Sequence, residues 1–309
     1  MCRRMLRPFT LILGLSLALA QIQAAASTDQ TIFLPLLANG SPPYDHGTLV
    51  FEWPIRGGGG GLYLVTVTGA TTTYPPVALT PGSQPNWSPD GQQIVFVAAR
   101  TGLEGDLFVI NRDGAQLTQL TDTPEDSEGE PVWSPDGTRI AFSSTHNGFQ
   151  IHVMHADGSG RTQLTSGSGR ATHPTWAPDG SRIAFTLDSN APGTFTPHIA
   201  MLQADGSGQT RVTEQIGWRP EWSPDGRRIL FNGAGGLWFM NPDGSHITPG
   251  PHVAATDAKW APDSTWIIFS RSLSEYPPAP GLEVVRGDGT GSTTLLCCSD
   301  FLSPAWSPQ

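Results

Sequence analysis

The chain has 309 residues and carries 17 Lys and Arg against 27 Asp and Glu, a formal net charge of −10. An acidic surface repels phosphate backbones, so this charge argues against nucleic acid as a partner. Ten Trp and thirteen Phe supply ample core and exclude a disordered chain. Abundant Gly and Pro, with alternating apolar runs and almost no helical periodicity, indicate an all-β protein with very few helices.

The first 26 residues match a secretory signal peptide. Three arginines open the chain, residues 11–20 are apolar, and small residues at 24–26 supply a cleavage site. The apolar run is too short to span a membrane. We therefore predict cleavage after Ala26 and a periplasmic or extracellular location. The mature chain then holds 14 basic and 27 acidic residues, a net charge of −13.

Residues 27–46 form a short N-terminal extension with an apolar patch at 32–37. Three apolar segments follow at 48–51, 62–65 and 77–79, and each is predicted to be a strand. None of them carries the tryptophan phrase that recurs in the rest of the chain. This first unit therefore lacks an opening strand.

A short phrase then occurs six times, in its fullest form as PVWSPDGTRIAF over residues 131–142. Its tryptophans are 46, 43, 46, 38 and 46 residues apart. They are Trp87, Trp133, Trp176, Trp222, Trp260 and Trp306. A period near 40 to 50 made of short strands and turns is typical of a propeller or solenoid. Each Trp is expected to be an apolar plate between neighbouring units.

The third unit shows how one repeat makes four strands. We predict strands at 131–134, 140–142, 151–154 and 162–165. The first two are joined by a Ser-Pro-Asp-Gly turn and the last two by an Asp-Gly-Ser-Gly turn. Four antiparallel strands make one propeller blade. In the fifth repeat of the phrase Ser264 replaces the turn glycine, which would cost strain if its φ is positive.

The chain ends on an opening strand, residues 303–308, with no further strand after it. The simplest arrangement lets this strand complete the first unit, which lacks one. The fold prediction is therefore a six-bladed β-propeller of four-stranded antiparallel blades over residues 47–309, whose first blade is closed by the C-terminal strand. Closure also removes exposed sheet edges.

The phrase Pro-x-Trp-Ser-Pro-Asp-Gly with a later Asp-Gly-Ser-Gly resembles the WD40-like repeat of TolB-type six-bladed propellers, over nearly the whole mature chain. The resemblance implies a protein of the periplasmic Tol–Pal envelope system, whose propeller binds a peptidoglycan-associated lipoprotein. In that family an α/β domain precedes the propeller, whereas residues 27–46 stand there in this chain. Related repeats occur in prolyl-peptidase and tricorn-type proteases, but no room remains for a hydrolase domain.

Binding residues are expected at the mouth of the central channel. The two short turns of each blade fall on one face, so the variable loops 100–106, 122–130, 188–197 and 273–281 gather on the other. The residue before the repeat proline starts the innermost strand and is predicted to rim the channel there. These six positions are Gln84, Glu130, His173, Arg219, Asp257 and Ser303. Such a polar ring suits peptide termini, carboxylates or a cation; the alternative is a solvated channel without a ligand.

Two further groups of residues are candidates for metal ligands. The acidic link comprises Asp122, Glu125, Asp126, Glu128 and Glu130, and it could hold Ca²⁺, which favours several oxygen ligands. It lacks the glycine spacing of a calcium loop, so a solvated charged loop is the alternative. The pair His152 and His155 points to opposite faces of a strand and is predicted to be ordinary strand residues.

The adjacent Cys297 and Cys298 also point to opposite faces of a strand, which favours reduced or buried thiols over a bond between them. No Gly-x-Ser-x-Gly elbow is present to support a serine hydrolase.

The leading hypothesis is an exported, non-catalytic and monomeric binding module for a protein, peptide or envelope-associated ligand, without a cofactor. One alternative is a metal-dependent enzyme, such as a lyase acting on acidic sugars at the channel mouth. The other is an envelope scaffold without a small ligand that assembles through residues 32–37 or the termini.

Overall fold

The computed structural model describes residues 46–54, 60–68, 71–72, 77–99, 105–188, 196–253, 255–271, 281–297 and 302–308. Within these ranges every regular element is a β-strand, as the sequence predicts. No helix in the described ranges has the length and apolar character to cross a bilayer. The predicted signal peptide and the extension up to residue 45 lie outside the described residues.

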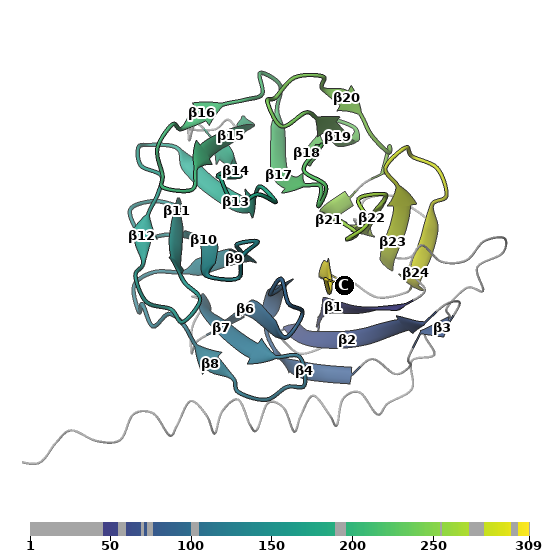
Figure 1. Ribbon diagram of the computed structural model, residues 1–309, viewed down its shortest axis with the longest axis horizontal. Helices are drawn as coiled ribbons and strands as arrows, with labels where there is room; N and C mark the ends of the chain where they lie inside the picture. The colour runs from purple at the N-terminus through teal and green to yellow at the C-terminus, as the bar shows by residue number, and fades with distance from the viewer. Residues whose placement is uncertain are drawn as a thin grey trace, which may run out of the picture.

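Six antiparallel sheets stand around a central axis (Figure 1). The second blade contains β5 (Ser83–Trp87), β6 (Gln93–Ala99), β7 (Gly105–Asn111) and β8 (Thr118–Gln119). The third contains β9 (Glu128–Trp133), β10 (Arg139–Ser144), β11 (Gln150–His155) and β12 (Thr162–Gln163). The fourth contains β13 (Arg170–Trp176), β14 (Arg182–Asp188), β15 (Pro197–Gln203) and β16 (Thr210–Arg211).

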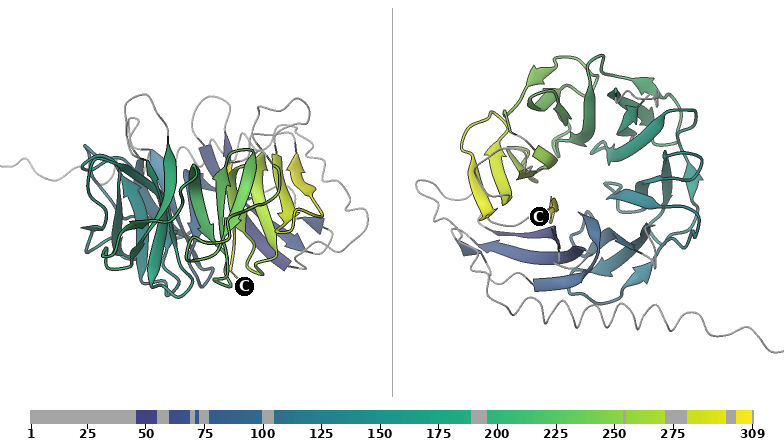
Figure 2. Two further views of the ribbon diagram at one scale, coloured as in Figure 1. Left: turned by 90° about the horizontal axis from the view of Figure 1, so that it is seen from above. Right: turned by 180° about the vertical axis from the view of Figure 1, so that it is seen from behind.

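The fifth blade contains β17 (Gly217–Trp222), β18 (Ile229–Gly233), β19 (Gly236–Met240) and β20 (Thr248–Pro249). The sixth contains β21 (Ala255–Trp260), β22 (Trp266–Arg271), β23 (Gly281–Arg286) and β24 (Thr293–Cys297). In each of these blades the first strand is innermost and the strands run between the two faces of the ring (Figure 2).

The first blade joins the two ends of the propeller, as predicted. It contains β1 (His46–Pro54), β2 (Gly60–Thr68), β3 (Thr71–Thr72), β4 (Val77–Pro81) and β25 (Leu302–Trp306). The C-terminal β25 is its innermost strand and pairs with β1, with Leu49 opposite Trp306. The next blade holds β25 as well, because Trp87 Nε1 donates to the carbonyl of Ala305 at 3.1 Å.

This blade has five strands, so the prediction of four strands in every blade is wrong for it. Both β3 and β4 pair with the outer edge of β2, β3 at Val67 and Thr68 and β4 from Gly61 to Leu64. Two short strands therefore share an edge that a single fourth strand occupies in the other blades.

Aromatic side chains at equivalent positions build the core. The second strand of each blade contributes one fully buried Phe, and these are Phe51, Phe96, Phe142, Phe185, Phe231 and Phe269. Five of the repeat tryptophans are also buried, while Trp306 is partly buried. Three of them receive an arginine from the preceding blade, as where Arg139 stacks 4.7 Å from Trp176. Such cation–π contacts add to the apolar packing between blades.

The short turns are built from side-chain hydrogen bonds. In the third blade the Ser134 hydroxyl donates to Asp136 at 2.6 Å, and the same carboxylate accepts the N–H of Thr138. These bonds lower the pKa of Asp136. Ser264 has φ of 60°, so the strain expected there is present. Its hydroxyl accepts the N–H of Asp225 from the neighbouring blade, which partly compensates that strain.

Candidate functional site

Each innermost strand is interrupted at its ring residue. The pairing register between the first and second strands shifts there in all six blades, as a β-bulge does. Five ring residues have φ between 47° and 56°: Gln84, Glu130, His173, Arg219 and Ser303. A bulge leaves one residue outside the ladder and turns its side chain. The proline that follows in these five has no N–H to lose.

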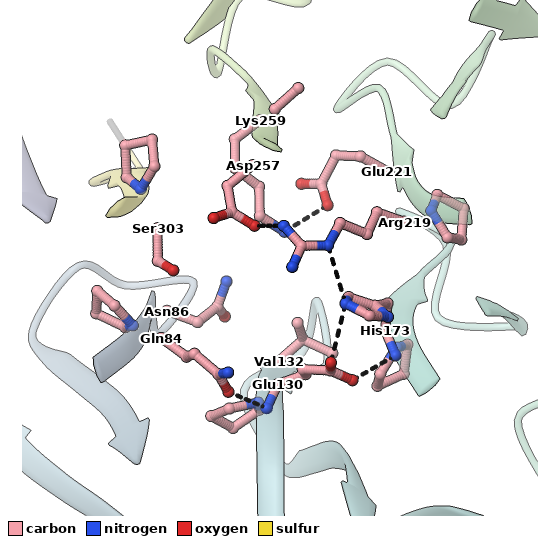
Figure 3. Close-up of a pocket in the computed structure, with 16 residues that line it drawn as sticks. Gln84, Asn86, Glu130, Val132, His173, Arg219, Glu221, Asp257, Lys259 and Ser303 are labelled. Carbon is pink, nitrogen blue, oxygen red and sulfur yellow. Dashed lines mark hydrogen bonds and ion pairs between the residues drawn. The ribbon is translucent and has the colours of Figure 1, made fainter. Parts of the chain in front are cut away.

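The bulges bring all six ring side chains to one cavity at the channel mouth (Figure 3). The cavity has a volume of about 100 Å³ and is also lined by the repeat prolines. Pockets for drug-sized ligands usually measure about 300–1,000 Å³. This mouth therefore has room for one side-chain head group or chain terminus. Whether the ring residues bind such a group stays a prediction.

Four of the ring residues, from four consecutive blades, form a charged arc. His173 Nε2 lies 2.9 Å from Glu130 Oε1 and 3.0 Å from Arg219 Nε. Arg219 also pairs with Asp257 through its Nη1 (Figure 3). A single ring nitrogen cannot donate to Glu130 and accept from Arg219 at the same time. Which of the two contacts is a hydrogen bond therefore depends on the tautomer of His173.

The carboxylate of Glu130 is held in the arc by several hydrogen bonds. Its Oε2 accepts the backbone N–H of His173 at 2.6 Å and the hydroxyl of Ser143 at 2.9 Å. Burial alone raises the pKa of Glu130, but the charge and hydrogen bonds of His173 and the Ser143 bond outweigh it and lower the pKa to about 2. Glu130 is therefore ionised at neutral pH although its side chain is only 22% exposed.

The remaining ring positions are neutral. Gln84 Oε1 accepts the N–H of Glu130 at 2.6 Å, and Ser303 lies between Gln84 and Asp257 in the order of the blades. Just inside the ring, Lys259 Nζ pairs with Glu221 Oε2 at 2.6 Å. The mouth thus combines a charged sector, internally paired, with a neutral sector made by the first two blades (Figure 3).

A second tier of residues lies behind the ring, and the sequence did not predict it. It consists of the residue after each buried Phe: Glu52, Val97, Ser143, Thr186, Asn232 and Ser270. Thr186 Oγ1 accepts the N–H of Arg219 from the next blade at 2.8 Å. Glu52 accepts the N–H of Gln84 in the same way. In the sequence, five of the six blades carry a polar residue at this repeat position, and this was the only signal for the second tier. The sequence does not show that these residues lie behind the ring, because that placement depends on the bulge.

Comparison with known proteins agrees with this fold. The family described as "TolB beta propeller domain" matches residues 62–157 and 125–309. The chain belongs to the TolB β-propeller family. This confirms the resemblance carried by the repeat phrase.

Solved structures share the fold of this TolB-like propeller. TolB from Acinetobacter baumannii has 18% identity and a TM-score of 0.70, with 85% of this chain and 67% of that chain covered. A putative TolB from Agrobacterium tumefaciens has 19% identity and a TM-score of 0.61, over 86% and 100%. An oligogalacturonate lyase in complex with manganese has 14% identity and a TM-score of 0.53, over 83% and 73%. No curated protein matches the chain.

The acidic link of the TolB-like propeller does not converge on one point. Glu128 points into the space between two blades, where its fully buried carboxylate pairs with Arg161 at 3.1 Å. Asp126 pairs with the exposed ring of His146 at 3.0 Å, and Glu130 lies in the channel mouth. Nowhere in the described ranges do three or more His, Cys, Asp or Glu side chains gather to hold a metal ion. The link therefore offers no common centre for Ca²⁺.

Glu128 and its neighbours form a polar cluster between the second and third blades. Thr121 and Thr123 donate to its two oxygens at 3.1 and 2.8 Å. Burial raises the pKa of Glu128, and the hydrogen bonds and Arg161 offset this only in part. His152 is buried beside Arg161, and burial and that positive charge lower its pKa to about 4. His155 is exposed, so the two histidines lie on opposite faces as predicted.

Several predicted features fall on parts of the chain that are not described. The variable loops at 100–104, 189–195 and 272–280 are among them, while the link 122–130 is described. Cys298 and the side chain of Cys297 also lie outside the described residues, so the state of these thiols stays a prediction.

Proposed function

We propose that this TolB-like propeller is an exported, non-catalytic binding module that holds a protein, peptide or envelope-associated ligand at its channel mouth. The observation that carries the proposal is the set of five ring residues with positive φ. Such backbone costs of order 1–3 kcal/mol per residue for a non-glycine and is found mostly at functional sites. Here it directs side chains to one small cavity.

The contrast between core and ring supports this proposal. The core positions use the same residue in every blade, Phe on the second strand and Trp in the repeat phrase. The ring position carries six different residues, five of them on the same backbone bulge with positive φ. A structural requirement would select one residue type at six equivalent places. Ring chemistry is therefore better explained by a ligand than by folding.

A metal-dependent lyase is the second candidate, because a manganese-bound oligogalacturonate lyase shares the fold and the ring contains one His, one Glu and one Asp. In the arc, however, Glu130 and Asp257 pair with His173 and Arg219. Metal analysis of the purified protein tests this candidate. A tightly held transition metal that disappears in His173→Ala would favour the lyase over the binding module.

The experiment that tests binding is crosslinked capture from cell envelope and culture medium, with residues 27–309 as bait. The channel variant is Glu130→Ala/His173→Ala/Arg219→Ala. The control is Arg227→Ala, an arginine that is 85% exposed in a short turn on the opposite face. A partner kept by the control and lost by the folded channel variant supports the proposal. A partner kept by both, or none at all, contradicts it.

The proposed export has its own test. Sequencing the N-terminus of the protein from periplasm and medium should find residue 27 or a near neighbour. An intact Met1 in a cytoplasmic fraction would contradict export.

A further inference from the structure

A second cavity lies beside the channel mouth, between the second and third blades. Its volume is about 330 Å³, against about 100 Å³ for the mouth, so it reaches the size of pockets that hold small organic ligands. Gln84 and Glu130 line both cavities. The polar and aromatic side chains that line this side pocket alone are Ser83, Ser127, Glu128, Ser143, Thr145 and Phe149.

Four side chains of the side pocket carry hydrogen-bond donors that no described residue accepts. The hydroxyls of Ser127 and Thr145 accept backbone N–H groups at 3.2 and 2.8 Å, and neither donates to a described residue. The Ser83 hydroxyl forms no hydrogen bond with a described residue. The amide oxygen of Gln84 accepts a backbone N–H at 2.6 Å, which leaves both N–H groups of that amide without a described acceptor. These donors require oxygen acceptors from a ligand or from water.

An aromatic residue on a strained backbone completes the side pocket. Asn147, Gly148 and Phe149 have φ of 55°, 93° and 59° in succession. A positive φ is rare for a bulky residue and is found mostly at functional sites. The fourth blade holds Phe149 in place, because its carbonyl accepts the N–H of Ala171 at 2.8 Å and its ring stacks 4.0 Å from Arg170. Phe149 lines the pocket and Arg170 does not, so the aromatic side chain forms part of the wall.

The charges around the side pocket favour an uncharged ligand. Among the described residues that line it there is no lysine, arginine or histidine, so nothing compensates the charge of an anionic ligand. Its two acids already have partners, since Glu128 pairs with Arg161 and Glu130 with His173. A cationic ligand would have to compete with those pairs. A neutral ligand that is rich in oxygen therefore matches the pocket best.

The placement of the donors distinguishes a sugar from a peptide. Two donors belong to β5, Ser127 precedes β9, and Thr145 follows β10, so they reach the pocket from separate walls. A sugar ring carries oxygens around its whole edge and can accept from several walls at once. An extended peptide presents its carbonyls one per residue, about 3.3–3.6 Å apart along a line. The C–H groups of a sugar ring also pack well on an aromatic face such as that of Phe149.

We propose that the side pocket binds one ring of an uncharged sugar. The oxygens of the sugar accept from the four donor groups, and its C–H face packs on Phe149. The inference goes beyond the proposed function, which concerns the mouth, and makes the side pocket a separate binding site. It also argues against a uronate in this pocket, because no base among the described lining residues faces the uronate carboxylate.

The test uses three uncharged trisaccharides, cellotriose, maltotriose and triacetylchitotriose, with trigalacturonate as the acidic match and trialanine amide as the peptide. Saturation-transfer NMR detects binding to the purified protein, and titration calorimetry measures the affinity of the sugar that binds best. Ser83→Ala removes a hydroxyl that supports no described contact, so this variant should fold normally. Ser307→Ala is its matched control, because the Ser307 hydroxyl also has no described partner and lies outside both cavities. Phe149→Leu removes the aromatic face, and Phe149→Tyr keeps it.

We expect the wild type, Ser307→Ala and Phe149→Tyr to bind at least one uncharged trisaccharide, and to bind trigalacturonate at least about tenfold more weakly. Ser83→Ala should lose about fivefold in affinity, as for removal of one neutral hydrogen bond. Phe149→Leu should lose about tenfold, because the aromatic face is gone. In saturation-transfer spectra the ring C–H protons of one sugar unit should give the strongest signals.

Three results would overturn the inference. They are no binding of any uncharged trisaccharide, equal affinities of Ser83→Ala and Ser307→Ala for the bound sugar, and trialanine amide bound in place of the sugars. Ser83 and Phe149 line the side pocket and not the mouth, so failure of sugar binding leaves the function proposed for the mouth standing.

Discussion

Glu128 and Glu130 lie two residues apart in β9 and have opposite surroundings. Glu128 is enclosed between blades, where burial raises its pKa and Arg161 balances its charge. Glu130 follows in the bulge with φ of 56°, faces the channel, and has a pKa of about 2. The local sequence Glu-Gly-Glu gives no sign of this difference. One backbone bulge therefore separates an acid that joins two blades from an acid of the candidate site.

The largest expected loss of stability comes from replacing Glu128, the acid enclosed between two blades. Glu128→Ala leaves Arg161 largely buried without its partner, which should destabilise the fold by about 3 kcal/mol. Urea unfolding of the wild type and the variant measures this loss. Glu214→Ala serves as the control and should keep the wild-type midpoint. A midpoint for Glu128→Ala equal to that of the control would show that the ion pair does not hold the blades together.

Replacing Glu130 should instead change how the stability of the fold depends on pH. Because its folded pKa is lowered, the stability it contributes is present above its ordinary pKa of about 4.3 and is lost as the pH falls towards 2. Between these two pH values the free energy of unfolding of the wild type should fall by about 2 kcal/mol more than that of Glu130→Gln. This figure is reduced to account for the partial exposure of Glu130. Thermal unfolding from pH 7 to pH 2 tests this. Parallel curves for the two proteins would refute it.

A third glutamate sharpens the contrast, because no arginine or histidine among the described residues forms an ion pair with Glu52. Its folded pKa is raised, so its favourable contribution is present below its ordinary pKa and is lost as the pH rises through the folded value. Glu52→Gln should therefore be about 1 kcal/mol more stable than the wild type at pH 7 and not at pH 4. Urea unfolding of the wild type and the variant at pH 7 and at pH 4 tests this prediction. A variant without added stability at pH 7 contradicts it.

The smallest effect concerns the bulge itself. Ser303→Gly removes the cost of a positive φ but gains freedom in the unfolded chain, so we expect a net stabilisation of about 0.5 kcal/mol. Ser307, whose φ is not positive, provides the control, and Ser307→Gly should destabilise. Differential scanning calorimetry compares the two. Loss of stability in both variants would mean that the bulge carries no measurable strain.

The sequence predicted the repeated parts of this fold and missed the parts that depart from the repeat. Six blades and the closing strand follow from the tryptophan period and from the unmatched segments at the two ends. The five-stranded first blade did not follow, because no Trp phrase marks its strands. Five of the six ring positions were found through the proline after them, and Asp257 through its place in the repeat. The pairing of Glu128 did not follow, because the bulge in β9 breaks the two-residue alternation from which the face of a side chain is inferred. The position of Glu52 did not follow either, because the bulge beside it lies in its partner strand β25.

The pairing of β25 with β1 also has a consequence that we expect for folding. The inner edge of β1 stays open until the last strand has been made, because its partner lies at the far end of the propeller sequence. The other five blades can stack while the first blade is incomplete, so we expect the final step to be the docking of one short strand into a preformed slot. Contacts of such sequence separation form late and slowly. During that interval a second copy's β25 competes for the same edge, which makes strand exchange between molecules the characteristic error of this fold.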